Sequence, residues 1–156
     1  MQKSSVIHNT FTIERVYPAP TEKVFAAFAD PARKRRWYAE ADHHDVEQFE
    51  MDFRAGGAER FLYRFRPGTP FPGAALSSEG TYQDILPGSR IVITSSMSLG
   101  DRRISVSLVT IELLPEGAGT RLVCVHQAAF FEGSDGPEMR EAGWRTLFER
   151  LATALS

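Results

Sequence analysis

Between residues 49 and 128 the chain alternates apolar and polar side chains in short runs, separated by turns that contain glycine or proline. A period of two is typical of strands that bury one face and expose the other. Leu86-Pro87-Gly88-Ser89 places proline and glycine at the centre of a type II turn, and residues 115–119 predict a second hairpin. Because a sheet with one apolar face must be covered, this segment constrains the rest of the fold.

Only one other stretch is long enough to cover such a sheet. Residues 137–155 carry apolar side chains at helical spacing, which predicts a helix with a wide apolar stripe. We expect this helix to lie across the sheet and to bury Leu147, Phe148 and Leu151. A fragment that ends at residue 136 would then expose the apolar face of the sheet.

The segment before the sheet predicts a strand and two short helices. Residues 11–18 alternate as a strand, a helix follows Pro20, and Asp30-Pro31 ends that helix and caps the next, which contains Trp37. The chain is therefore an α+β protein: a curved antiparallel sheet of about six to seven strands, two short helices after the first strand, and a long C-terminal helix. A curved sheet wrapped on one helix often closes incompletely, which leaves an apolar cavity between them.

Length and charge limit the classes of protein to which the chain can belong. With 156 residues and 42% hydrophobic composition, we expect a polar lead-in over residues 1–10 and a single domain over residues 11–156. A net charge of −2 argues against nucleic acid as a partner. The one cysteine, Cys124, cannot form an internal disulfide, and no apolar run suits a signal peptide or membrane insertion. These features predict a cytoplasmic protein.

Motifs for catalysis, cofactors and metals are missing from the sequence. No G-x-S-x-G elbow or phosphate-binding glycine loop occurs, so we expect no catalytic residues and no cofactor. His43 and His44 are adjacent and would point to opposite sides of a strand, so we expect no metal site. The basic run Arg33–Arg36 could bind an acidic partner, but the acidic residues that follow can neutralise it.

Candidate ligand-binding residues come from the inward positions of the predicted sheet and helix. Tyr63 and Tyr82 are the preferred polar anchors, because a buried phenol needs a hydrogen-bond partner, and Tyr82→Phe should then alter ligand preference more than stability. His126 is a further candidate only if its strand face points inward, and the pattern leaves that open. The same side chains could simply fill a core. The candidates are Phe49, Met51, Phe61, Tyr63, Phe65, Tyr82, Met97, His126 and Phe148, with the proline-rich loop 66–78 and the short helices as the mouth.

Five segments in this order resemble a known family, the SRPBCC or START-like superfamily with its helix-grip fold, and within it the homologues of the activator of heat-shock protein 90 ATPase. The segments are ERVYPAPTEKVFAAFADPARKRRW (14–37), DFRAGG (52–57), EGTYQDILPGSRIVIT (79–94), LLPEGAGTRLVCVHQ (113–127) and EAGWRTLFERL (141–151).

The resemblance implies the helix-grip fold and places Trp37 and Trp144 near the cavity, where Trp144 could also serve packing alone. It implies three alternatives for function: non-catalytic binding of a small hydrophobic or amphipathic ligand, a protein-interaction module, and an enzyme of the cyclase or hydrolase type. A protein partner would be a chaperone or a second copy of the chain.

Overall fold

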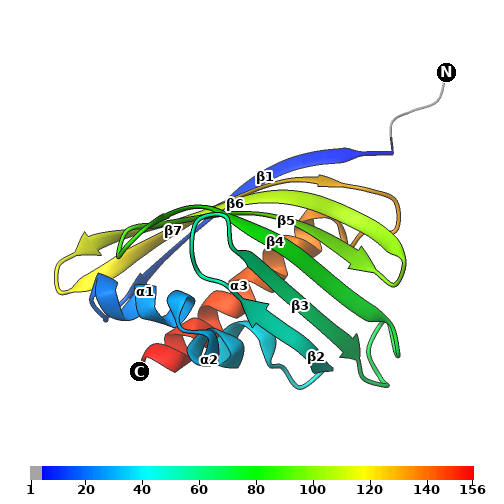
Figure 1. The fold of residues 1–156 in the computed structure, drawn as a ribbon, viewed down its shortest axis with the longest axis horizontal. Helices are drawn as coiled ribbons and strands as arrows, with labels where there is room; N and C mark the ends of the chain where they lie inside the picture. Colours follow the sequence, from blue (N-terminus) through cyan, green and yellow to red (C-terminus); the bar gives the residue numbers. More distant parts are fainter. Residues whose placement is uncertain (1–4) are drawn as a thin grey trace.

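The computed structural model describes residues 5–156 and consists of a seven-stranded antiparallel sheet curved around one long helix (Figure 1). The first four residues of the predicted lead-in lie outside the described residues. The elements are β1 (Ile7–Tyr17), α1 (Thr21–Ala29), α2 (Pro31–Lys34), the π-helical turn η1 (Arg35–Ala39), β2 (His44–Met51), β3 (Ala58–Phe65), β4 (Ala75–Leu86), β5 (Arg90–Leu99), β6 (Arg102–Glu116), β7 (Gly119–Phe130) and α3 (Gly136–Leu155). This is the α+β helix-grip architecture that the sequence predicts.

The strands from β2 to β7 form a meander in chain order, and β1 pairs with β7 at the far edge. The lead-in prediction was wrong for residues 7–10: β1 begins at Ile7, because these residues pair with Gln127 to Phe130 of β7. At the other edge, β2 begins at His44, earlier than the alternating run from Phe49 indicates. The predicted loop 66–78 is shorter than expected, since β4 begins at Ala75.

Local signals set several of the element boundaries. Asp30 Oδ1 accepts a hydrogen bond of 2.9 Å from the backbone N–H of Ala32, so Asp30 caps α2 as predicted. The Ser89 N–H donates to the Leu86 carbonyl over 2.9 Å, and Gly88 adopts φ +76°, which only glycine adopts easily. The type II turn prediction is therefore confirmed.

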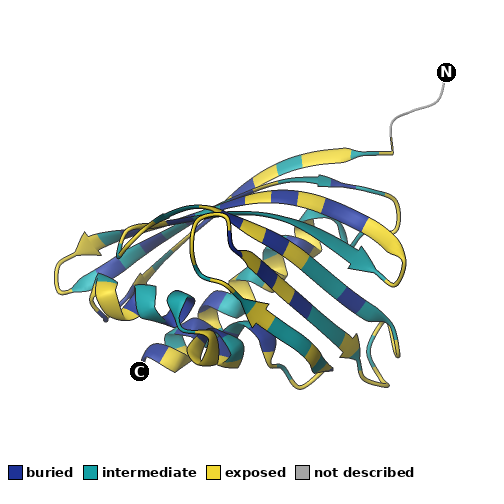
Figure 2. Ribbon diagram, viewed as in Figure 1, coloured by how far each residue is buried: buried dark blue, intermediate teal, exposed yellow. Residues whose placement is uncertain are grey.

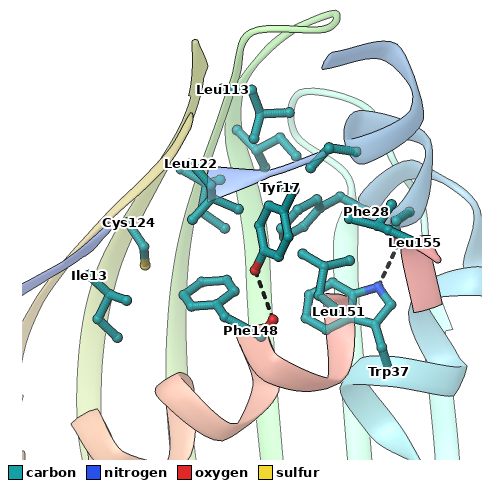
Figure 3. Close-up of a cluster of buried hydrophobic side chains, with 14 of the residues drawn as sticks. Ile13, Tyr17, Phe28, Trp37, Leu113, Leu122, Cys124, Phe148, Leu151 and Leu155 are labelled. Atoms are coloured by element: carbon teal, nitrogen blue, oxygen red, sulfur yellow. Dashed lines mark hydrogen bonds between the residues drawn. The ribbon is translucent and has the colours of Figure 1, made fainter. Parts of the chain in front are cut away.

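Helix α3 covers the concave face of the sheet, and burial alternates along the strands beneath it (Figure 2). Phe148 and Leu151 are fully buried, and the Tyr17 hydroxyl donates to the Phe148 carbonyl over 2.8 Å (Figure 3). The prediction for Leu147 was wrong, because this side chain is only half-buried. No helix among residues 5–156 combines the length and the hydrophobicity needed to cross a bilayer.

Candidate functional site

A cavity of about 390 Å³ separates α3 from the part of the sheet that β3, β4 and β5 form. Its walls are mainly aromatic and aliphatic side chains, and they come from the sheet, from α3, from η1 and from the connecting loops. The lining comprises Tyr38, Ala41, His43, His44, Phe61, Tyr63, Phe65, Phe71, Leu76, Ser78, Met97, Leu99, Ile104, Gly133, Asp135, Met139, Arg140, Gly143, Trp144, Thr146, Leu147 and Arg150.

Five of the predicted ligand-binding residues lie together in this lining: Phe61, Tyr63, Phe65, Met97 and Trp144. Alternate positions of β3 point to the same side of the sheet, which is why Phe61, Tyr63 and Phe65 face α3 together. The rings of Phe61 and Tyr63 lie 4.8 Å apart, and those of Tyr63 and Phe65 lie 5.3 Å apart. They form a continuous aromatic wall.

The other six predicted residues do not line the cavity. Trp37 and Tyr82 border a separate void of about 30 Å³, roughly the space of one water molecule. Phe49 packs on the Tyr38 and Phe61 rings, Met51 packs against the core, and Phe148 is fully buried beneath Tyr17. His126 points inward, which settles the parity of its strand, but it stacks on Phe11 with ring centroids 4.5 Å apart.

The mouth of the cavity lies beside α3, where lining residues are also exposed. Met139 and Gly143 form its helix side, and His43 and Phe71 form the opposite side. Phe71 belongs to the proline-rich loop, so that part of the predicted mouth is observed. The short helices were wrongly included, because α1 and α2 contribute no lining residue and only Tyr38 of η1 does.

Sequence reasoning missed the charged lining residues of α3 and its N-terminal loop. Arg140 is only 7% exposed, although arginine in a helix normally indicates a solvated face. Its Nε and Nη2 donate to the two Asp135 carboxylate oxygens over 2.8 Å each, and Nη2 also donates to Ser105 Oγ over 2.9 Å. Arg140 lies one helical turn before Trp144, and that spacing is the signal that could have found it.

Burial and the Arg140 charge act in opposite directions on the groups around them. Burial tends to raise the pKa of Asp135, but the hydrogen bonds from Arg140 outweigh it and hold that pKa below its usual value. Burial raises the pKa of Tyr63 to about 12, and Arg140 opposes that rise. Tyr63 is therefore a neutral hydrogen-bond donor at physiological pH.

The two tyrosines predicted as polar anchors differ in how their hydroxyls are used. The Tyr82 hydroxyl donates to the Glu59 carboxylate, which also accepts from Lys34 Nζ over 2.5 Å, and all three side chains are buried. Tyr63 Oη has no hydrogen-bond partner among residues 5–156, although its residue lines the large cavity. The expectation for Tyr82→Phe is therefore reversed: that change should affect stability, while Tyr63→Phe should affect binding.

Two buried histidines each keep a nitrogen that is unpaired within residues 5–156. His44 Nε2 lies 2.6 Å from the Ala39 carbonyl oxygen, so Nε2 carries the proton and Nδ1 has no partner. Burial lowers the pKa of His44, and the charges of His43, Arg150 and Arg66 lower it further. Burial also lowers the pKa of His126 to about 4. In the described part of the chain, no three His, Cys, Asp or Glu side chains are grouped so that they could hold a metal ion.

Acidification from pH 7 to pH 4 should destabilise the protein by about 3 kcal/mol through His126 alone. The unfolded chain takes up this proton near pH 6.5, whereas folded His126 resists it down to about pH 4. Stability is therefore complete above pH 6.5 and is lost as the pH falls toward 4. His126→Phe keeps a ring against Phe11 but has no group that titrates in this range. In urea unfolding, its free energy of unfolding relative to the unmodified protein should therefore be about 3 kcal/mol higher at pH 4 than at pH 7. An unchanged difference between the two proteins would contradict this.

Comparisons with known proteins agree with the fold. The family model described as Activator of Hsp90 ATPase homolog 1-like protein matches residues 18–156. An uncharacterized protein from Rhizobium leguminosarum is 34% identical, with a TM-score of 0.87 and coverage of 97% of this chain and 96% of that chain. The Mll3558 protein from Rhizobium loti is 46% identical, with a TM-score of 0.84 and coverage of 97% and 99%.

A more distant structure, of an AHSA1-like protein from Aeromonas hydrophila, is 20% identical to this chain, with a TM-score of 0.66. The match covers 94% of this chain and 92% of that chain. At this identity the likeness shows the fold alone. A search of curated proteins finds no match.

Proposed function

This chain belongs to the family of Activator of Hsp90 ATPase homolog 1-like proteins, and on that premise we propose that it binds a small apolar or amphipathic molecule, without converting it, between the sheet and α3. The observation that carries the proposal is the aromatic cavity of about 390 Å³. Protein interiors rarely leave space much larger than a water molecule, whereas small-molecule pockets measure about 300–1,000 Å³. The proposal places this binding in the cytoplasm.

The lining supports an amphipathic ligand over a purely apolar one. Aromatic rings from β3, from the loop before β4 and from α3 supply apolar contact area. Arg140, Tyr63 and Tyr38 add polar groups at the walls, which can orient a ligand without supplying most of its affinity.

Filling the mouth of the cavity from α3 should abolish binding while the fold stays intact. A Cβ atom added at Gly143 meets no heavy atom within 4 Å, and glycine within a helix is destabilising by about 1 kcal/mol relative to alanine. Gly143→Phe should therefore fold at least as well as the unmodified protein and place a ring in the mouth. The measurement is fluorescence titration with the neutral dye N-phenyl-1-naphthylamine.

Ala142→Phe is the matched control for this titration, because Ala142 is exposed, precedes Gly143 on the same helix and does not line the cavity. We expect saturable dye binding to the unmodified protein and to Ala142→Phe, and at least a tenfold loss in Gly143→Phe. Equal binding by all three proteins would place the dye elsewhere and count against the cavity as the binding site.

A protein-interaction role is the second candidate, and the description of the matched family favours it. In that case the chain would act on a chaperone, and the contents of the cavity would be secondary. The two roles separate in an ATPase assay with heat-shock protein 90 from the same cell. A saturable increase in rate that Gly143→Phe retains would favour the second candidate.

A further inference from the structure

The Arg140 guanidinium has donors in the cavity that the protein itself does not use. Arginine carries five N–H donors. Three of them have acceptors in the protein. The Nε donor and one Nη2 donor bond to Asp135, and the other Nη2 donor bonds to Ser105. Neither of the two Nη1 donors has an acceptor among residues 5–156. Nη1 is not one of the fully buried unpaired atoms of those residues, so it keeps accessible surface. The guanidinium lies over the Phe130 ring, with Cζ 5.1 Å from its centroid, and its Nη1 edge keeps donors for an incoming acceptor.

Tyr63 provides a second unused donor in the same cavity. Its hydroxyl has no partner within the described residues and keeps accessible surface. Tyr63 and Arg140 both line this cavity, and the Arg140 charge opposes the rise in the pKa of Tyr63. A ligand that displaces water from such donors must offer an acceptor in its place, or the donors are left unpaired. The unpaired Arg140 and Tyr63 donors therefore point to a ligand atom with lone pairs.

Charge in this part of the cavity indicates which kind of acceptor fits. Asp135 already neutralises Arg140 through two hydrogen bonds, so a ligand carboxylate here would add an uncompensated negative charge beside Asp135. The other arginine in the lining, Arg150, comes ten residues later in α3, about 15 Å along the helix axis, so it is not placed beside Asp135. An uncharged oxygen accepts the same hydrogen bonds without this cost.

We propose that the ligand carries a neutral carbonyl-type oxygen, as in a ketone, ester or amide, which accepts hydrogen bonds from Arg140 Nη1 and from the Tyr63 hydroxyl. The proposal rests on the proposed function, because it deepens the description of the same cavity. The apolar remainder of the ligand then lies along the Phe61–Tyr63–Phe65 wall. The expected ligand is therefore an uncharged amphipathic molecule whose carbonyl group lies at the Arg140 end of the cavity.

Three naphthalene dyes that share a dimethylamino group test this assignment. One carries a propionyl ketone, one a propyl chain without the oxygen, and one a carboxylate. Tyr63→Phe should weaken the ketone dye about three- to tenfold and leave the propyl dye unchanged, since one hydrogen bond is lost. Emission of the bound ketone dye should also shift to shorter wavelength, because its carbonyl loses a donor. Tyr63→Phe should fold normally, because its hydroxyl has no partner within residues 5–156.

Tyr82→Phe is the matched control, since its hydroxyl bonds to Glu59 and does not border this cavity. It should leave all three dissociation constants unchanged. Arg140→Lys keeps the charge but removes the Nη1 donors together with the guanidinium bonds to Asp135 and Ser105, and it should weaken the ketone dye at least as much as Tyr63→Phe does. Unchanged binding of the ketone dye by this variant would count against the assignment to Nη1.

Tighter binding of the carboxylate dye than of the ketone dye would overturn the neutral-oxygen assignment, as would equal effects of Tyr63→Phe on the ketone and propyl dyes. In either case binding of the propyl dye would leave the proposed function standing. Failure of all three dyes to bind would instead count against the proposed function.

Discussion

A fragment of residues 1–136 is expected to lose cooperative folding, because it lacks the helix that covers the concave face of the sheet. Phe148 and Leu151 of α3 are fully buried against β1 and the strands beside it (Figure 3). Without them the apolar side chains that α3 covers on β1 and the neighbouring strands would face water, at about 25 cal/mol for each Å² exposed. The fragment should be insoluble, or compact without a sharp urea transition. A soluble 1–136 fragment that unfolds cooperatively would contradict the account of the fold.

Single substitutions in α3 measure the same contribution on the full chain. Leu151→Ala should lower the free energy of unfolding by about 2–5 kcal/mol, because the site is fully buried and can collapse only partly. Leu86→Ala is a suitable control, since Leu86 is 48% exposed at the end of β4. Its effect should stay within about 0.5 kcal/mol.

Lys34→Met is expected to destabilise the folded state by about 3–5 kcal/mol. Lys34 and Glu59 are 7% and 6% exposed, and Lys34 Nζ lies 2.5 Å from the Glu59 carboxylate. Methionine keeps the length of the side chain and the packing over the Tyr38 ring, where Nζ lies 4.6 Å from the centroid. What is lost is the positive charge, so the Glu59 carboxylate remains buried, and within residues 5–156 only the Tyr82 hydroxyl is left as its partner.

Two further variants show whether this loss comes from the buried charge. Arg90→Met breaks an exposed ion pair with Asp84, also at short range (2.7 Å), and should cost less than about 1 kcal/mol. The double variant Lys34→Met/Glu59→Gln removes both charges and should recover much of the loss. A cost for Lys34→Met as small as that for Arg90→Met, measured by urea unfolding, would show that the buried pair contributes little.

The order of elements could be predicted from the sequence because each local signal agrees with the final fold. Period-two alternation, the Leu86–Ser89 turn and the Asp30 cap are short-range features, and the structure confirms all of them. The start of β1 at Ile7 could not be predicted, since residues 7–10 are mostly polar and become a strand only by pairing with β7. Tertiary pairing overrode local composition there.

The aromatic wall of the cavity could also be predicted, whereas its polar groups could not. Phe61, Tyr63 and Phe65 share one face of β3 by strand geometry alone. The different roles of Tyr63 and Tyr82 depend on Glu59, which reaches Tyr82 across β3 and β4. From the sequence, Arg140 is expected on the surface. In the fold it is buried and paired with Asp135 and Ser105. Such contacts join residues from separate elements, and alternation carries no information about them.

Photolabelling identifies the residues that a bound ligand contacts, and it therefore decides whether the cavity is the ligand site. The measurement uses a neutral naphthalene probe with a diazirine group, followed by peptide mapping of the labelled protein. We expect saturable labelling of peptides that contain β3, Met97 of β5 and residues 139–150 of α3, and loss of that labelling in Gly143→Phe. The competing apolar surface lies on the outer face of the sheet, where Val106 is 44% and Leu108 is 36% exposed. Labelling confined to those residues of β6, or no saturable labelling, would contradict this expectation.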